Sequence, residues 1–360
     1  MAELGFIGTY TGEKNGRGRG IYAFSFDPEK GVIEDMRLAV ETINPSWLCL
    51  SPSGEYLYSV NETSGFRGEV SGALSAYKIR RDGGLEYINQ VKSCGIAPCH
   101  LAIDDSETII ICSNYSSGVL SVYPVLKDRG VDEAAQVIGL EGKGPNPSRQ
   151  DGPHAHSFWF DRDYTRGFAC DLGTDRVMCY DVDVHGAAPL KPADPPWYKS
   201  SSGAGPRHMA FNPAGGTAYL LNELNSTIEV LKSYPFERIQ TISTLPEGFR
   251  GNNTAAAIRV SPDGNFVYAS NRGHDSIAVF KARKEGTLEL RSITGSGGAT
   301  PRDFNIDPAG NFLLAANQGS DNLLVFGIDK KEGGIEKTGE YSAPSPVCVV
   351  FRNRNPRAAR

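Results

Sequence analysis

Four residues at repeated positions of this 360-residue chain have side chains that could carry out acid–base and charge-stabilising chemistry: His156, Arg207, Glu223 and Arg272. Imidazole exchanges protons near neutral pH, and guanidinium groups bind carboxylates, phosphates and oxyanions. This combination offers cations for an anionic group and titratable groups for proton transfer. The candidate substrate-binding residues nearby in the repeat are His154, His208, Asn222, Asn271, His274, Arg302 and Asn317.

These positions are defined by an internal repeat of roughly 45 to 55 residues. Its copies read PSWLCLSPSGEYLYSVNE from Pro45, PCHLAIDDSETIIICSNY from Pro98, AHSFWFDRDYTRGFACDL from Ala155, PRHMAFNPAGGTAYLLNE from Pro206, AAIRVSPDGNFVYASNR from Ala255 and PRDFNIDPAGNFLLAANQ from Pro301. A recurring amide or acid closes each copy, at Asn61, Asn114, Asp171, Asn222, Asn271 and Asn317. Such self-similarity from end to end indicates one closed architecture, in preference to two or three separate domains.

Each copy predicts four antiparallel strands, which is the blade of a β-propeller. Two strands flank a turn such as SPDG or DPAG, where proline fits the first turn position and glycine the left-handed one. A third strand such as SIAVFKA and a fourth such as GTLELRSIT follow. The segment PVCVVF from Pro346 matches a first strand with no second strand after it, whereas LGFIGTYT from Leu4 lacks a first strand before it.

We therefore predict an all-β, seven-bladed propeller in which the C-terminal strand completes the N-terminal blade. A single domain is expected over residues 1–352, followed by a flexible tail at 353–360. An eighth blade or an open solenoid is the alternative, and the circular closure argues against it.

The start of each first strand and the end of each second strand should lie on the same rim, because the two strands are antiparallel. Of the six histidines, only His185 falls in an outer turn. The other five lie on this rim or within two residues of it: His100, His154, His156, His208 and His274. Arg207, Arg272 and Arg302 join Glu62 and Glu223 on the same side.

Structural roles compete with these functional ones. The recurring amides are most simply turn residues that bond their own backbone, as are Asp175, Asp275 and Asp321. Trp47 and Trp159 are expected to pack between blades, and His100 to be a hydrogen-bonded structural residue. A buried ion pair would explain Arg207 and Glu223 together. His154 and His156 resemble half of a metal site, but no third ligand stands at a telling spacing, so neither a metal nor a cofactor is expected.

Composition excludes several classes of partner. A net charge of −5 leaves no basic stripe for nucleic acid, and no segment approaches eighteen apolar residues, so no membrane partner is expected. The seven cysteines are odd in number and lie mostly within predicted strands, which favours a reducing compartment. We expect a cytoplasmic protein that is a monomer or a weak homo-oligomer.

The motifs GPHAHSFWF, GPRHMAFNP, YLLNELNSTIEV and SPDGNFVYASNRGHDSIAVF make the chain resemble the seven-bladed propeller lactonase family. That family includes bacterial propeller-type 6-phosphogluconolactonases and fungal 3-carboxy-cis,cis-muconate lactonizing enzymes, and the likeness runs from Gly8 to the PVCVVF segment. The resemblance implies His156, Arg207, Glu223 and Arg272 as catalytic residues. His156 is preferred over His154 because it stands in the repeat frame, four residues before Phe160.

The resemblance implies hydrolysis of a sugar δ-lactone, with 6-phosphogluconolactone of the pentose phosphate pathway as the expected substrate. His156 would act as general base or acid, and Arg207 would stabilise the oxyanion. Glu223 would orient Arg207 or the water, and Arg272 with His274 or Arg302 would hold the phosphate.

Two other functions remain open. A muconate-type cycloisomerase would use the same residues. The other is a non-catalytic propeller that binds a protein partner. It would be expected to expose aromatic residues on the rim, where Trp47 and Tyr115 are the only ones predicted.

Overall fold

The computed structural model describes residues 2–352, so the tail expected at 353–360 lies outside the described residues. Within that range, 28 strands form seven four-stranded antiparallel sheets. One short 3-10 helix, η1 (Gly12–Lys14), follows the first strand. This arrangement confirms the predicted all-β, seven-bladed propeller class, with one sheet per blade.

The sheets follow one another along the chain, and within each sheet the hydrogen-bonded neighbours stand in a regular order. The first contains β28 (Pro346–Phe351), β1 (Glu3–Thr9), β2 (Gly20–Asp27) and β3 (Val32–Glu41); the second β4 (Leu48–Leu50), β5 (Tyr56–Asn61), β6 (Ala73–Ile79) and β7 (Leu85–Lys92); the third β8 (Pro98–Ile103), β9 (Ile109–Asn114), β10 (Val119–Pro124) and β11 (Gln136–Gly139); the fourth β12 (Ala155–Phe160), β13 (Arg166–Asp171), β14 (Arg176–Val182) and β15 (Leu190–Lys199).

The remaining three sheets repeat the same order. The fifth contains β16 (Pro206–Phe211), β17 (Thr217–Asn222), β18 (Thr227–Lys232) and β19 (Arg238–Ser243); the sixth β20 (Thr254–Val260), β21 (Phe266–Arg272), β22 (Ser276–Ala282) and β23 (Leu288–Gly295); the seventh β24 (Pro301–Ile306), β25 (Phe312–Asn317), β26 (Asn322–Ile328) and β27 (Ile335–Ser342).

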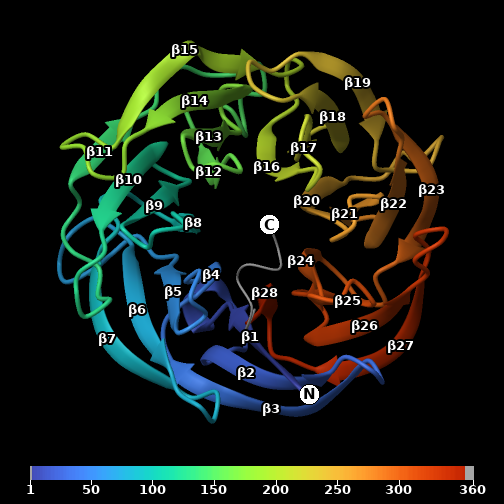
Figure 1. The fold of residues 1–360 in the computed structure, drawn as a ribbon, viewed down its shortest axis with the longest axis horizontal. Helices are drawn as coiled ribbons and strands as arrows, with labels where there is room; N and C mark the ends of the chain where they lie inside the picture. Colours follow the sequence, from blue (N-terminus) through green and yellow to red (C-terminus); the bar gives the residue numbers. More distant parts are fainter. Residues whose placement is uncertain (1, 353–360) are drawn as a thin grey trace. The chain divides into compact units, whose positions relative to one another are not determined.

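The C-terminal strand completes the N-terminal sheet, as predicted. Strand β28 pairs antiparallel with β1, in a register that places Gly5 opposite Phe351 and Ile7 opposite Val349. Figure 1 shows these two strands, from opposite ends of the sequence, side by side. The pairing covers the edge that β1 would otherwise present.

The turns between first and second strands have the predicted chemistry. Gly54, Gly264 and Gly310 take the left-handed conformation, with φ of 69°, 75° and 72°. The residue that opens the turn accepts hydrogen bonds from the start of the second strand, as Asp307 Oδ1 does from the Phe312 amide. An aspartate or serine therefore fixes the turn through its own side chain.

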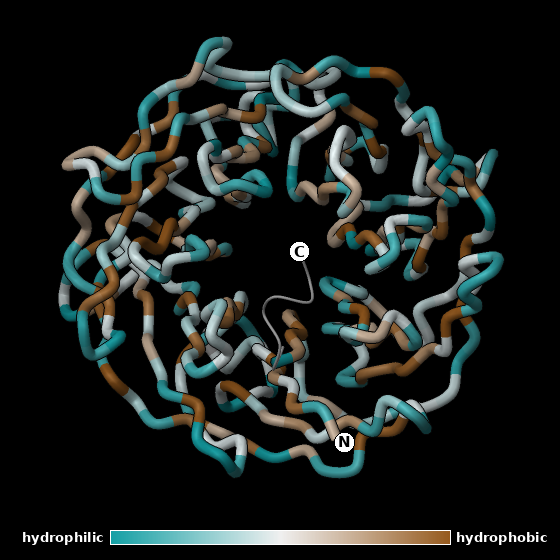
Figure 2. Tube along the Cα trace, viewed as in Figure 1, coloured by the Kyte–Doolittle hydropathy of each residue, from teal (hydrophilic) through white to brown (hydrophobic). Residues whose placement is uncertain are grey.

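Contacts between Cα atoms divide the chain into two compact units. Among the described residues, the first unit comprises 2–18, 22–38 and 208–352, and the second comprises 19–21 and 39–207. Within each unit the apolar cores lie between consecutive sheets, for example between the sixth and seventh sheets and between the second and third. Figure 2 shows the hydrophobic stretches along the strands, while hydrophilic residues predominate at the turns.

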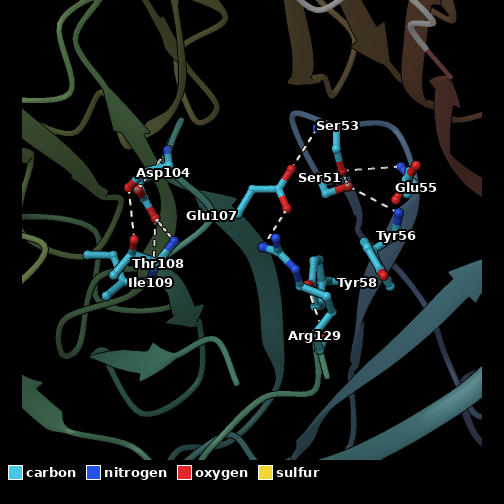
Figure 3. Close-up of polar contacts among 11 residues, drawn as sticks. Ser51, Ser53, Glu55, Tyr56, Tyr58, Asp104, Glu107, Thr108, Ile109 and Arg129 are labelled. Atoms are coloured by element: carbon cyan, nitrogen blue, oxygen red, sulfur yellow. Dashed lines mark hydrogen bonds and ion pairs between the residues drawn. The ribbon is translucent and has the colours of Figure 1, made fainter. Parts of the chain in front are cut away.

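Within the second unit, a buried carboxylate joins the second and third sheets (Figure 3). Glu107 accepts a hydrogen bond from the Ser53 amide at 2.6 Å and one from Arg129 Nη1 at 2.8 Å. Glu107 stands at the turn position that other sheets give to glycine, and its φ is 55°. A left-handed conformation costs a non-glycine residue free energy, which these two charge-assisted bonds offset.

All seven cysteines are in the thiol form, and five of them are buried. Burial raises the pKa of the Cys170 thiol to about 12. Among residues 2–352, the structure contains no helix of the length and apolarity needed to cross a membrane.

Candidate functional site

In the second unit, the second residues of three consecutive first strands form a chain of contacts. These residues are Cys99 on β8, His156 on β12 and Arg207 on β16. Arg207 Nη1 contacts His156 Nε2, and Cys99 Sγ lies 3.9 Å from His156 Nδ1. All three side chains are buried. Two of the four predicted catalytic residues are therefore in direct contact.

The partners of His156 define the state of its imidazole. A guanidinium has only donors, so Nε2 of His156 is the acceptor in its contact with Arg207. The ring is then neutral and carries its proton on Nδ1, which faces Cys99 Sγ. The Cys99 thiol in turn donates to the His156 carbonyl oxygen at 3.2 Å. The nitrogen toward Arg207 therefore has the lone pair that a general base requires.

The third residues of these strands hold the backbones together. Ser157 Oγ donates to the carbonyl of Arg207 at 2.7 Å, and the Phe158 amide donates to His100 Nδ1 at 3.3 Å. The ring of His100 stacks on Trp47 at a centroid distance of 4.3 Å and lies 4.8 Å from that of Trp159. This confirms the predicted packing role of both tryptophans and the structural role of His100.

His154 contacts this site through the ring of Tyr115. Its ring stacks on Tyr115 at 4.6 Å with an interplanar angle of 11°, and the Tyr115 ring meets His156 edge-on at 5.4 Å. His154 Nδ1 donates to the Tyr115 carbonyl at 3.0 Å, and its backbone amide donates to Asp171 Oδ1 at 2.8 Å. Burial raises the pKa of Asp171 in spite of these hydrogen bonds. Tyr115 thus separates His154 from His156 and contacts both.

The other two predicted catalytic residues pair with each other in the first unit. Arg272 Nη2 lies 3.0 Å from Glu223 Oε2, and the side chains are 14% and 4% exposed. Arg272 also donates to the carbonyl of Ala255 at 3.3 Å. Glu223 directly follows β17 and Arg272 ends β21, so the ion pair links equivalent ends of the fifth and sixth sheets. The pair with Arg272 was not expected from the sequence, and the suggested pairing of Glu223 with Arg207 stays a prediction.

Three further predicted binding residues lie in the first unit. His274 is held by its amide, which donates to Asn253 Oδ1, by a contact of Nδ1 with Ser276 Oγ at 2.8 Å and by the ring of Phe249. The guanidinium of Arg302 lies over the Tyr10 ring at 5.1 Å. His208 on β16 is buried.

The recurring amides at Asn222, Asn271 and Asn317 are fully buried. Asn271 Nδ2 donates to the Thr244 carbonyl and Asn317 Nδ2 to the Ser296 carbonyl, both in the connection that enters their sheet. The expectation that such amides are turn residues bonding their own backbone is therefore incomplete. Asn222 Nδ2 donates to the side-chain oxygen Oγ1 of Thr227 across the turn.

The predicted turn aspartates also reach beyond their own turns. Asp175, Asp275 and Asp321 all have positive φ. Their carboxylates accept the backbone amide of the residue just before the next first strand, from Gly205, Thr300 and Ser345 respectively. Each aspartate therefore positions the start of a first strand, which is where the candidate residues lie.

No cluster of three or more potential metal ligands is present among the described residues. The site, as far as residues 2–352 show it, consists of hydrogen-bonding and charged side chains.

A family model described as lactonase, 7-bladed beta-propeller matches residues 5–351. The chain belongs to this family. It is 35% identical to a 6-phosphogluconolactonase of Bacillus subtilis over 97% of this chain and 98% of that protein. Among solved structures, a periplasmic gluconolactonase of Pseudomonas aeruginosa superposes with a TM-score of 0.92 at 31% identity, covering 98% of this chain and 99% of that one. A putative 6-phosphogluconolactonase of Bacteroides fragilis gives a TM-score of 0.89 at 32% identity, with 98% of each chain covered.

Two residues of this lactonase-family protein were on the predicted rim but outside the predicted site: Cys99 and Tyr115. Cys99 occupies the same repeat position as His156 and Arg207, so the repeat alignment held the signal for its contact. Tyr115 follows a recurring amide in the same way that Glu223 does. Its ring contacts depend on side-chain rotamers, which no sequence pattern specifies.

Proposed function

We propose that this lactonase-family protein hydrolyses a sugar lactone, and that its substrate is 6-phosphogluconolactone, which it converts to 6-phosphogluconate. The contact between Nε2 of a neutral His156 and the guanidinium of Arg207 carries the proposal. A base and a cation in contact are what ester hydrolysis needs for water activation and oxyanion stabilisation. The name of the relative from Bacillus subtilis supports the choice of lactone.

In the proposed reaction, His156 Nε2 takes a proton from a water molecule whose oxygen attacks the lactone carbonyl carbon. The resulting oxyanion is stabilised by Arg207, which exchanges its contact with Nε2 for one with the substrate oxygen. The bond from the carbonyl carbon to the ring oxygen then breaks, and His156 returns its proton to that oxygen. The product is an open-chain hydroxy acid, which loses its carboxyl proton to solvent.

The family resemblance implies a catalytic role for Glu223 and Arg272, which form an ion pair in the first unit. This pair keeps a cation and a carboxylate mostly buried, and the attraction between them must offset the desolvation cost of burying both charges. The reaction steps proposed above rest on His156 and Arg207 alone.

The decisive assay measures clearance of freshly generated 6-phosphogluconolactone and of 3-carboxymuconolactone above their spontaneous rates. The wild-type protein, Arg207→Ala and His156→Ala are compared, with Arg162→Ala as a matched control because Arg162 is exposed in the turn after β12. We expect turnover of the phosphorylated lactone and a loss of about 100-fold or more in both site variants.

Each outcome of this assay has a clear meaning. Turnover of the muconolactone alone would replace the proposal with a cycloisomerase. If neither lactone is cleared faster than it decays, the lactonase proposal fails. If both site variants keep the wild-type rate, the assignment of His156 and Arg207 is wrong.

A further inference from the structure

The connection that leads into β12 is the longest of its kind in the second unit. Strand β11 ends at Gly139 and β12 begins at Ala155, so fifteen residues (140–154) join them, whereas the connections into β8 and β16 have five and six. Long ordered connections in compact folds usually carry function. This one ends two residues before His156, so it brings additional side chains to the candidate catalytic pair.

The buried side chain of Gln150 anchors the middle of this connection. Gln150 is fully buried, and its Nε2 donates to the Leu172 carbonyl at 2.8 Å and to Asp175 Oδ1 at 2.7 Å. Its Oε1 accepts the Asn146 amide at 3.1 Å, and its own amide donates to the Asn146 carbonyl. The residue immediately before this anchor is Arg149, whose backbone is therefore well positioned.

Arg149 and Tyr115 place two hydrogen-bond donors together. Arg149 Nη2 donates to the Tyr115 hydroxyl at 3.3 Å. The hydroxyl oxygen accepts in this contact, and its own proton can be donated to an anion that the guanidinium also binds. Both residues are partly exposed. A guanidinium beside a phenol offers a phosphate several donors and a full positive charge.

The Arg149–Tyr115 pair lies next to the candidate catalytic residue His156. The Tyr115 ring contacts His156 on one side, while its hydroxyl contacts Arg149. The guanidinium is thus separated from the catalytic imidazole by one aromatic ring. In a 6-phosphorylated sugar δ-lactone, the phosphate is carried by C6 on C5, and C5 shares the ring oxygen with the reacting carbonyl carbon, so the phosphate and the carbonyl must be bound at neighbouring positions.

We infer that Arg149 and Tyr115 form the subsite for the phosphate group of a phosphorylated lactone. This inference rests on the proposed lactone hydrolysis and names the residues that give it a preference for a phosphorylated substrate. It replaces the expectation that Arg272, with His274 or Arg302, holds the phosphate. Asp151 is a nearby acidic residue in the same connection: its Oδ1 lies 3.5 Å from His154 Nε2, and its side chain is 75% exposed and is screened by solvent.

The test compares kcat/KM for 6-phosphogluconolactone with that for the unphosphorylated glucono-δ-lactone. In Arg149→Met we expect the ratio of the two values to fall by about 10- to 100-fold, because hydrogen bonds to charged groups contribute about 1.5–3 kcal/mol. Arg149→Lys should recover part of the ratio, and Tyr115→Phe should lower it by a smaller factor. Asp151→Asn should raise it slightly, and Arg162→Met should leave it unchanged.

Two results would overturn the inference. An equal loss on both substrates in Arg149→Met would show that Arg149 supports the fold or the chemistry and does not select the phosphate. If the ratio of the two kcat/KM values is unchanged in Arg149→Met but reduced in Arg272→Met or Arg302→Met, the phosphate is bound by the residues expected from the sequence.

A binding measurement separates this inference from the proposed function. Inorganic phosphate is titrated into the wild-type protein and into Arg149→Met by isothermal calorimetry at low ionic strength. Saturable binding to the wild type that Arg149→Met lacks supports the subsite even if neither lactone is hydrolysed. No binding to the wild type, or equal binding to both, contradicts it.

Discussion

The guanidinium of Arg207 contacts Nε2 of His156, and the two residues occupy the same position in consecutive first strands. The Arg207 carbonyl also accepts a hydrogen bond from Ser157 Oγ, which follows His156 directly. The contact between the side chains is therefore supported by a contact between the strands. A base and an oxyanion donor held in this way are expected to act as one unit.

Coupling between these two residues is the first prediction. His156→Ala and Arg207→Ala should each lower kcat/KM by about 100- to 1,000-fold, and the double variant should be little worse than either single one, because groups that act in one step are strongly non-additive. The coupling is measured as a double-mutant cycle, from initial rates of the wild type, the two single variants and the double variant with one sugar lactone. Fully multiplicative losses would mean that the residues act independently.

The repeat was sufficient to predict the fold and part of the site. Strand count, turn chemistry and closure by β28 follow from patterns of period two and from glycine and proline positions, which are local properties of the chain. The pairing of His156 with Arg207 was also within reach, because equivalent positions of consecutive first strands are neighbours.

Side-chain contacts other than those between equivalent positions of consecutive first strands could not be predicted from the sequence. Glu223 forms an ion pair with Arg272 in the next sheet, a contact that the position of Glu223 in its own hairpin does not specify. The stacking of His154 on Tyr115 depends on the path of a fifteen-residue connection that no repeat copy shares. Such contacts are decided by rotamers and by connection geometry, and neither leaves a periodic signal in the sequence.

Cys99 is predicted to be a positioning residue for His156. Its thiol faces Nδ1 and bonds the His156 carbonyl, so Cys99→Ala should leave the imidazole less well oriented. We expect kcat to fall about fivefold, equivalent to about 1 kcal/mol, with little change in KM. The pH profile of kcat should also shift, because the Nδ1 proton loses its partner, and Cys99→Ser should restore part of the rate. A wild-type kcat and pH profile in Cys99→Ala would contradict this role.

The Glu223–Arg272 ion pair is predicted to stabilise the first unit only as a pair. Removing one partner leaves a mostly buried charge, so Glu223→Ala and Arg272→Ala should each lower the free energy of unfolding by about 2–4 kcal/mol. The double variant should lose less than the sum of the two. Urea denaturation of all four proteins measures this coupling, and additive losses would show that the pair is not energetically coupled.

Asp303 is expected to make stability depend on pH. Burial raises its pKa, and the charge of Arg259 together with a hydrogen bond from the Val349 amide only partly counters this. The folded protein therefore takes up this proton at a higher pH than the unfolded chain does. Stability from this group rises as the pH falls through the raised pKa toward the ordinary value of about 3.9.

The variant Asp303→Asn isolates that effect. It should be less stable than the wild type at pH 7, because both carboxylate oxygens accept hydrogen bonds, from Arg259 and from the Val349 amide, and the asparagine amide nitrogen can accept neither. The difference in unfolding free energy between the two proteins should grow as the pH is lowered from 7 to 4.5, since only the wild type gains from protonation. Urea denaturation of both proteins at pH 7 and at pH 4.5 shows whether the difference in unfolding free energy grows or shrinks. A difference that shrinks at low pH would mean that the pKa of Asp303 is lowered in the folded state.

Glu107 provides a test in which glycine should be a better replacement than alanine. Its left-handed φ of 55° strains any residue with a Cβ, while its carboxylate holds Ser53 and Arg129 across two sheets. Glu107→Ala keeps the strain and loses both bonds, whereas Glu107→Gly loses the bonds but relieves the strain. We therefore expect both variants to be less stable than the wild type, with the glycine variant more stable than the alanine variant by about 1 kcal/mol.

The control for Glu107 is Gly215→Ala, at a turn where φ is 84° and a Cβ would meet nothing within 4 Å. The loss of unfolding free energy in Gly215→Ala measures only the cost of placing a residue with a Cβ in the left-handed conformation. This loss should equal the difference in unfolding free energy between Glu107→Gly and Glu107→Ala. Urea denaturation of the four proteins closes the comparison. If Glu107→Ala is as stable as Glu107→Gly while Gly215→Ala is destabilised, the turn at Glu107 must relax on substitution, and the carboxylate bonds would then be what holds it in the left-handed conformation.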